Sequence, residues 1–355
     1  MHRELLDKLT GGSPLDRDGY LTLIKNRNTV REHAAALACD LRRKYYGDRI
    51  FIRGLIEFTN HCRNNCYYCG IRAGNNAADR YRLDRDEILT CAGQGYELGF
   101  RTFVLQCGED PYYTDEMLTD IIKGIKHAHP DCAVTLSIGE RSYESYRLLK
   151  EAGADRYLLR HETVNPGHYA ALHPSSMSHE ERIKCLYTLK ELGYQTGAGF
   201  MVGTPGQTDE DLADEMIFLR ELDPAMVGIG PFIPHKDTPF HDKAPGSGEL
   251  TTFLLSLIRL TLPSVLLPAT TALATIDPMG REKGIMAGAN VLMPNLSPAG
   301  VRNKYLLYDN KVCTGDEAAA CIECLKGRIE KTGCSIVTDR GDHNSINKRE
   351  SYHES

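Results

Sequence analysis

A strand, a turn and a helix follow one another repeatedly between residues 51 and 293, and this alternation constrains the fold more than any other feature. Short apolar runs alternate with segments that begin at a capping residue and continue with apolar residues at helical spacing. The expected strands cover residues 51–58, 102–106, 133–137, 156–160, 195–202, 225–229, 265–271 and 289–293. Strands that alternate with helices pair in parallel through right-handed crossovers.

Eight such units in about 240 residues predict an α/β fold, a complete (β/α)8 barrel of the TIM type. An open, doubly wound sheet is the alternative. Residues 1–50 are expected to form a helical cap, with the barrel over 51–293. Residues 294–337 form a C-terminal appendage, and the polar tail 338–355 is predicted to be disordered. A barrel places its functional groups in the loops that follow the strands.

Composition excludes several classes of protein. The formal net charge of -6 shows no excess of basic residues of the kind that binds nucleic acid. No run of about 18 apolar residues suggests a membrane span, and the N-terminus lacks the apolar region of a signal peptide, which predicts a cytoplasmic protein. The 12 cysteines are clustered rather than spread as a disulfide framework requires, so metal ligation is the better interpretation.

The first cysteine cluster follows the first expected strand. Cys62, Cys66 and Cys69 stand in a C-x3-C-x2-C frame. Three thiolates leave one iron of a four-iron cluster open, and an open metal position is where a substrate or cofactor binds. A zinc knuckle with a distant fourth ligand and a reduced surface cluster are the alternatives. A second triad in the appendage consists of Cys313, Cys321 and Cys324.

Polar residues also follow the next strands. The second strand ends in Gln106, with Gly108 and Glu109 behind it, and the glycine permits close backbone approach. In the third strand, Thr135 and Ser137 share one face and would point into a barrel. Hydroxyl groups that satisfy the backbone are the alternative for this pair.

The fourth strand carries Arg156 and Arg160, which a barrel interior tolerates only beside an anion. Glu162 follows as an acceptor for an ammonium group or ribose hydroxyls. Arg182, on the next helix, could bind a carboxylate through two hydrogen bonds, unless it is a solvated helix charge. His235, after the sixth strand, is either a general base or a loop histidine with a structural hydrogen bond.

The remaining candidates lie near the last strands and the appendage, where they would close the cavity or simply pack the core. They are Thr270, Thr271, Met293, Tyr305 and Tyr308.

The cysteine frame, with Tyr68 before its last member, resembles that of radical S-adenosylmethionine (SAM) enzymes. From about residue 10 to residue 335, the chain resembles the radical SAM family that matures [FeFe]-hydrogenases, a relative of biotin synthase and methylornithine synthase. The resemblance is carried by EFTNHCRNNCYYCGIR, VLQCGEDPYY, DRYLLRHETVNP, ELGYQTGAGFMVGTPGQT, MVGIGPFIPH and GANVLMPN. Cys107 departs from the second glycine that is usual before Gly-Glu.

The resemblance implies that the first triad holds a [4Fe–4S] cluster whose open iron binds SAM. It implies SAM contacts from Tyr68, Gln106, Gly108, Glu109, Ser137, Glu162, Arg182, Met226 and Tyr305. The substrate cavity would be lined by Thr135, Arg156, Arg160, Thr270, Thr271, Met293 and Tyr308. The second triad would hold a peripheral iron–sulfur cluster, typically [2Fe–2S].

The implied reaction is reductive cleavage of SAM to a 5′-deoxyadenosyl radical. The implied substrate is a cysteine-bound Fe(CO)2(CN) precursor supplied by a sister maturase, with a scaffold maturase and a low-potential electron donor as partners. A methylornithine-synthase-like mutase and a biotin-synthase-like sulfur-inserting enzyme are alternatives. A non-catalytic iron–sulfur carrier is an alternative of another class.

Overall fold

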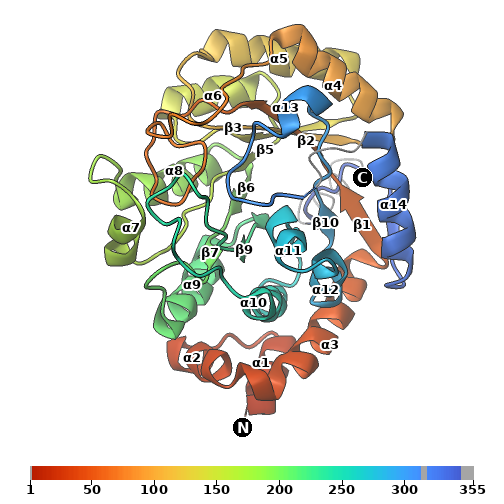
Figure 1. Ribbon diagram of the computed structural model, residues 1–355. Helices are drawn as coiled ribbons and strands as arrows, with labels where there is room; N and C mark the ends of the chain where they lie inside the picture. Colours follow the sequence, from red (N-terminus) through yellow and green to blue (C-terminus); the bar gives the residue numbers. More distant parts are fainter. Residues whose placement is uncertain (1, 313–317, 345–355) are drawn as a thin grey trace.

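The computed structural model describes residues 2–312 and 318–344, with strands on the inside and helices around them (Figure 1). The strands are β1 (Arg49–Ile52), β2 (Gly54–Thr59), β3 (Thr102–Cys107), β4 (Ala133–Ser137), β5 (Arg156–Leu158), β6 (Gln195–Ala198), β7 (Met201–Val202), β8 (Met226–Val227), β9 (Gly230–Pro231), β10 (Val291–Leu292) and β11 (Ser335–Val337). The helices are α1 (His2–Thr10), α2 (Arg17–Lys25), α3 (Arg27–Tyr46), α4 (Arg85–Glu97), α5 (Asp115–Ala128), α6 (Tyr143–Glu151), α7 (Pro166–Leu172), α8 (His179–Glu191), α9 (Asp209–Leu222), α10 (Gly248–Thr261), α11 (Thr271–Ile276), α12 (Gly280–Met286), α13 (Ala299–Arg302) and α14 (Ala318–Glu330).

Several helices begin at side chains that cap their first turn. Asp84 accepts a hydrogen bond from the Glu87 amide at 2.9 Å, and the Glu87 carboxylate accepts one from the Asp84 amide at 2.7 Å. Thr208 and Asp211 form the same reciprocal pair at the start of α9, and the Thr114 side chain accepts a hydrogen bond from the Met117 amide at the start of α5. These caps satisfy amide groups that have no partner inside the helix. They also fix where each loop ends, and these loops carry the predicted site residues.

The central sheet is parallel throughout. Six strands pair in the order β2-β3-β4-β5-β6-β8. Beyond its edges, isolated parallel bridges join Met226 to Leu266, Pro268 to Val291 and Leu55 to Asn295. The predicted parallel α/β architecture is therefore confirmed.

The prediction of eight regular strands needs correction in three places among the described residues. The expected first strand is divided into β1 and β2, which belong to different sheets. The expected seventh strand is represented only by isolated bridges, because Thr270 caps α11 and the chain turns into a helix there. The expected fifth strand is divided into β6 and β7. At the break, Gly199 has φ +156°, and a Cβ placed on it would stand 2.0 Å from the Gly228 carbonyl oxygen. The neighbouring backbone approaches too closely for any other residue.

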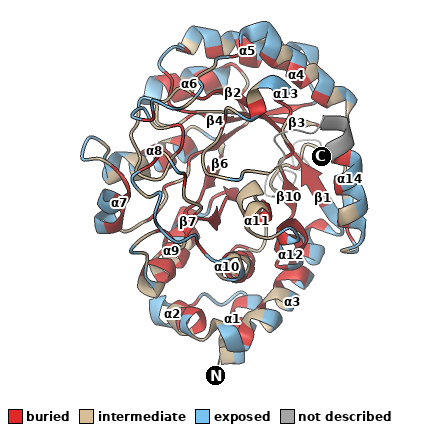
Figure 2. Cartoon of the chain, viewed as in Figure 1, coloured by how far each residue is buried: buried red, intermediate tan, exposed pale blue. Residues whose placement is uncertain are grey.

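Burial follows the same inside-to-outside order. Most strands are buried, while the surrounding helices have a buried inner face and an exposed outer face (Figure 2). Fully buried arginines are among the exceptions to an apolar interior, and buried charge needs compensating partners. Arg259, on α10, donates to the carbonyl groups of Gly288 and Pro263. Its burial lowers its pKa to about 10.

The N-terminal helices lie along the outside of the molecule (Figure 1). α3 packs against α10, and α2 packs against α9. Ion pairs join Arg17 to Asp214 and Lys25 to Glu210 between α2 and α9. No described helix is both long enough and apolar enough to cross a membrane.

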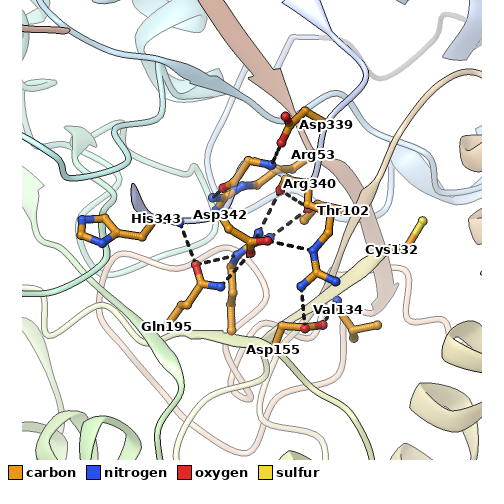
Figure 3. A network of polar contacts seen from close by, with 12 residues as sticks. Arg53, Thr102, Cys132, Val134, Asp155, Gln195, Asp339, Arg340, Asp342 and His343 are labelled. Atoms are coloured by element: carbon orange, nitrogen blue, oxygen red, sulfur yellow. Dashed lines mark hydrogen bonds and ion pairs between the residues drawn. The ribbon is translucent and has the colours of Figure 1, made fainter. Parts of the chain in front are cut away.

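The C-terminal appendage returns to the first strand. β11 pairs in parallel with β1 on the side opposite β10. The chain then continues as the tail segment, residues 338–344, beside the starts of β3, β5 and β6 (Figure 3).

The tail segment is held by polar contacts, which corrects the prediction that the whole tail is disordered. Thr102 Oγ1 donates to the Arg340 carbonyl at 2.7 Å. Arg156 donates to the same carbonyl at 2.8 Å and forms an ion pair with Asp342. The polar composition of the tail does not show that Thr102 and Arg156, far away in the sequence, bind it in the folded protein. Residues from 345 onward lie outside the described residues.

Candidate functional site

The three cysteines of the first triad lie in the loop between β2 and α4. Backbone hydrogen bonds hold this loop: the Arg63 amide donates to the Glu109 carbonyl, and the Gly70 amide donates to the Leu307 carbonyl, both at 2.9 Å. The guanidinium group of Arg80 donates to four carbonyl groups, those of Asn60, Ile71, Arg72 and Asn75. The loop is therefore rigid although it contains no regular secondary structure.

Two glycines allow other segments to approach the cysteines. A Cβ on Gly108 would stand 2.2 Å from the His61 carbonyl oxygen and 2.7 Å from the Cys62 Cβ. A Cβ on Gly70 would stand 2.2 Å from the Leu306 carbonyl oxygen and 2.4 Å from a His235 ring carbon. The predicted close backbone approach at Gly108 is thus present, and Gly70 provides a second one.

The thiol environment favours a shared cluster over a single ion. Burial raises the pKa of the Cys66 thiol to about 12 and also raises the pKa values of Cys62 and Cys69. Thiols this close and this buried ionise together only when a metal compensates their charge. Within the described residues, no three His, Cys, Asp or Glu side chains are arranged for one metal ion. A four-iron cluster suits the triad because each thiolate binds a different iron.

A cavity of about 340 Å³ opens beside the triad, at the ends of the strands. Most of the predicted site residues line this cavity, although they belong to different strands and loops. They are Cys62, Cys66, Tyr68, Cys69, Gln106, Gly108, Glu109, Ser137, Arg160, Glu162, Arg182, Thr270, Thr271, Met293, Tyr305 and Tyr308.

One wall of the cavity carries a chain of charges. Arg182 Nε lies 2.6 Å from a Glu140 oxygen, and Arg182 also lies 3.7 Å from Glu109. Arg63 contacts the other Glu109 oxygen at 3.0 Å. Arg182 is therefore a largely shielded, paired group, with 11% of its side chain exposed, and not a solvated helix charge. Burial raises the pKa of Glu140, while the adjacent Arg182 partly opposes that shift.

The cavity lining also contains Arg160, Glu162 and Tyr68. Arg160 and Glu162 form an ion pair at 2.7 Å. The Tyr68 hydroxyl lies 3.1 Å from His173 Nε2, and burial raises the pKa of Tyr68 well above its ordinary value. Burial lowers the pKa of His173 to about 4, so this imidazole is neutral at pH 7. The cavity thus offers carboxylates, guanidinium groups and aromatic surface together.

One ion pair at the cavity wall was not predicted from the sequence. Lys311 Nζ contacts Glu57 at 2.5 Å and donates to the Tyr305 carbonyl at 2.9 Å. Asn295 donates to the second Glu57 oxygen at 2.7 Å. A glutamate within the apolar run of the first strand was the available signal. Its partner 254 positions later could not be predicted from the sequence.

Three of the predicted residues do not line the cavity. Arg156 is the first residue of β5, so it lies at the opposite end of the strands and binds the tail segment. The Met226 sulfur accepts from Arg53 at 2.7 Å. Thr135 is buried, and its hydroxyl has no hydrogen-bond partner among the described residues. Strand parity indicates which face a residue occupies but not its height along the barrel.

His235 has a structural environment. Its Nδ1 accepts from the Asp237 amide at 3.1 Å, and its ring packs against Gly70. The structural alternative for this histidine fits these contacts. The second cysteine triad is only partly visible: Cys324 is exposed, Cys313 lies outside the described residues, and the Cys321 side chain is not described. A cluster there stays a prediction.

Comparisons with known proteins agree with this site. Residues 56–219 match the family model described as Radical SAM superfamily. The [FeFe] hydrogenase maturase subunit HydE of Thermotoga maritima is 49% identical over 344 residues, which cover 97% of this chain and 98% of that protein. The 3-methylornithine synthase of Methanosarcina acetivorans is 28% identical over 92% of each chain.

Two solved structures share the fold. Methylornithine synthase (PylB) superimposes with a TM-score of 0.82 at 25% identity, over 94% of this chain and 97% of that one. The HydG maturase of the [FeFe]-hydrogenase gives 0.77 at 20% identity, over 93% and 74%. Near-complete coverage at almost half identity is decisive, and this chain belongs to the HydE family of [FeFe] hydrogenase maturases, within the radical SAM superfamily.

Proposed function

We propose that this enzyme uses its cavity to process a cysteine-bound Fe(CO)2(CN) precursor during assembly of the diiron site of [FeFe]-hydrogenase. The single observation that carries this proposal is the three-cysteine loop facing a charged cavity in a chain 49% identical to a HydE. A [4Fe–4S] cluster with bound SAM would supply reductive cleavage to the 5′-deoxyadenosyl radical. Cys62, Cys66 and Cys69 would hold that cluster.

The cavity walls would orient SAM. Arg160, Glu162 and Arg182 all line the cavity, which suits a ligand with both an ammonium and a carboxylate group. Tyr68 and Tyr305 provide aromatic surface. Glu162 is the residue best placed to accept from an ammonium or from ribose hydroxyls. The residues of this chain therefore bind and orient, while the bound groups supply the radical chemistry.

We also infer that the strands close into a complete (β/α)8 barrel. The bridges at Leu266, Pro268 and Asn295 support this, because they continue the six-stranded sheet from both edges. Closure would exclude water from the cavity, which protects a radical from side reactions.

The remaining assignments belong to the same proposal. A HydG-like maturase would supply the precursor, a HydF-like scaffold would receive the product, and a low-potential donor would provide electrons in the cytoplasm. Cys313, Cys321 and Cys324 would hold a second, peripheral cluster, [2Fe–2S] in type. The chain would divide into a helical cap (1–50), a barrel (51–293) and an appendage (294–337).

A mutase of the methylornithine synthase type is the second candidate, because that structure has a TM-score of 0.82. Two experiments are needed, and the first tests the SAM cleavage that both candidates share. The purified protein is reconstituted anaerobically with iron and sulfide, and 5′-deoxyadenosine is measured after addition of dithionite and SAM. We expect Cys66→Ala to abolish the product and Cys324→Ala to spare most of it.

The substrate is then tested by adding the enzyme to a hydrogenase maturation mixture that lacks only its HydE. Restored hydrogenase activity supports the maturase. If 5′-deoxyadenosine forms but activity is not restored, the substrate assignment fails and the mutase becomes the better candidate. No 5′-deoxyadenosine from the reconstituted wild type would leave a non-catalytic carrier.

A further inference from the structure

The turn that follows β5 has an unusual backbone. Glu162 has φ +67°, which places a residue with a Cβ in the left-handed region. Such a conformation costs about 1 to 2 kcal/mol and persists only where the surroundings impose it. The same residue faces the cavity and pairs with Arg160. The position of the Glu162 carboxylate therefore depends on whatever holds this turn.

Glu215 holds the turn at both ends. It lies on α9, and its side chain is fully buried outside the cavity. One carboxylate oxygen lies 2.7 Å from His161 Nε2, and the other accepts from the Val164 amide at 2.6 Å. Among the described residues, Glu215 is the side chain that bonds both to His161, which precedes Glu162, and to Val164, which lies two positions after it.

The hydrogen bonds also indicate where the His161 proton lies. The Gly199 amide points to His161 Nδ1 at 3.4 Å, so Nδ1 accepts and Nε2 carries the proton. Nε2 then donates to Glu215. Both oxygens of Glu215 consequently receive N–H donors from the turn, and no oxygen is used to cap its own helix.

Other contacts act further along the turn. His179 lies 3.1 Å from the Thr163 carbonyl, and Asn165 donates to Asp211 at 2.6 Å. These contacts fix the start of α7. They do not reach His161. The amides of His161 and Glu162 both donate to the Gly199 carbonyl, at 2.9 and 3.1 Å, so a change of Glu215 would leave this backbone support and remove the side-chain support of the turn.

We propose that Glu215 is a positioning residue for SAM. Through His161 and the Val164 amide, it fixes the left-handed conformation of Glu162 and thereby the direction of the Glu162 carboxylate. The proposal rests on the assignment of Glu162 as a SAM contact. A positioning role predicts weaker SAM binding without loss of the cluster, because the cysteine loop is a separate segment.

The test is a double-mutant cycle between Glu215→Gln and Glu162→Gln. An amide side chain replaces one acceptor oxygen with a donor, so one of the two N–H groups loses its partner in either orientation. In cluster-loaded protein, we expect Glu215→Gln to raise the KM for SAM about tenfold, with kcat changed less. In the Glu162→Gln background, the same change should alter KM by less than about twofold, because its effect passes through Glu162.

A matched control addresses folding. Glu282→Gln changes another buried carboxylate that binds an arginine through both oxygens but does not line the cavity. We expect both variants to lower the melting temperature, while only Glu215→Gln raises the KM. Equal effects of Glu215→Gln in the two backgrounds, or an unchanged KM, would overturn the proposal. Absence of SAM cleavage in the wild type would instead refute the proposed function.

Discussion

At the scale of single residues, other segments can approach the cysteine loop closely because Gly108 and Gly70 have no side chain. The His61 carbonyl and the Cys62 side chain occupy the space that a Cβ on Gly108 would need. The Leu306 carbonyl does the same at Gly70. These contacts involve backbone atoms, which cannot move aside as a flexible side chain can.

Gly108→Ala is therefore expected to displace the cysteine loop. A Cβ 2.2 Å from a carbonyl oxygen requires a backbone shift, so we expect a large loss of bound iron and of 5′-deoxyadenosine formation. Gly93→Ala is the control, since it lies in α4 with no atom within 4 Å of its Cβ position and should add about 0.5 to 1 kcal/mol of stability. Full iron content in Gly108→Ala would show that the loop adapts.

At the scale of elements, the tail segment supplies the anion that the buried Arg156 requires. Gln195, the first residue of β6, also donates to Asp342, at 2.7 Å (Figure 3). Removing one partner of a buried pair costs more than the pair contributes, because the other charge stays buried. The last described residues of the chain thus stabilise the starts of three strands.

This pairing predicts a dependence on pH. Arg156 holds the pKa of Asp342 down at about 2, below its ordinary 3.8, against the opposing effect of burial. A depressed carboxylate pKa contributes stability above pH 4, and that stability disappears as the pH falls toward 2. We expect Asp342→Asn to lose about 2 kcal/mol of unfolding free energy at pH 7.

The measurement is urea unfolding followed by circular dichroism at several pH values. The difference between wild type and Asp342→Asn should narrow as the pH falls from 4 toward 2. Asp214→Asn is the control, because it removes an exposed pair with Arg17 and should cost at most about 1 kcal/mol. A constant difference at every pH would contradict the pairing.

At the scale of the whole molecule, residues 303–312 are the part of the appendage that lines the cavity and contacts the barrel. Its Leu307 carbonyl accepts from Gly70 in the cysteine loop, and its Asp309 amide donates to Pro234 in the loop after β9. Lys311 bonds to Glu57 inside β2. Three separate parts of the fold meet through this one segment.

Lys311→Met should release that segment. It leaves the Glu57 carboxylate buried without its cation, so we expect about 3 to 5 kcal/mol of destabilisation and faster hydrogen exchange over residues 303–312. The double variant Glu57→Gln/Lys311→Met should recover part of the stability, because no buried charge remains. If the double variant is as unstable as the sum of the singles, the two residues act independently.

The sequence by itself determined the periodic elements and the identity of the reactive loop. Caps such as Asp84 and Thr114 act within one helical turn, and the cysteine frame spans eight residues, so both depend on local geometry that a sequence displays. The resemblance to radical SAM enzymes added the contacts of Glu162 and Arg182, which come together at the cavity although different elements carry them.

The tertiary structure alone decided which charges meet. Arg156 was expected in the cavity but binds Asp342 at the other end of the strands. Glu57 pairs with Lys311, which lies 254 positions later in the chain. Such pairs depend on the height of each residue along its strand and on where a distant segment crosses the barrel. Neither quantity has a local signature, because a strand repeats every two residues whatever its register with its neighbours.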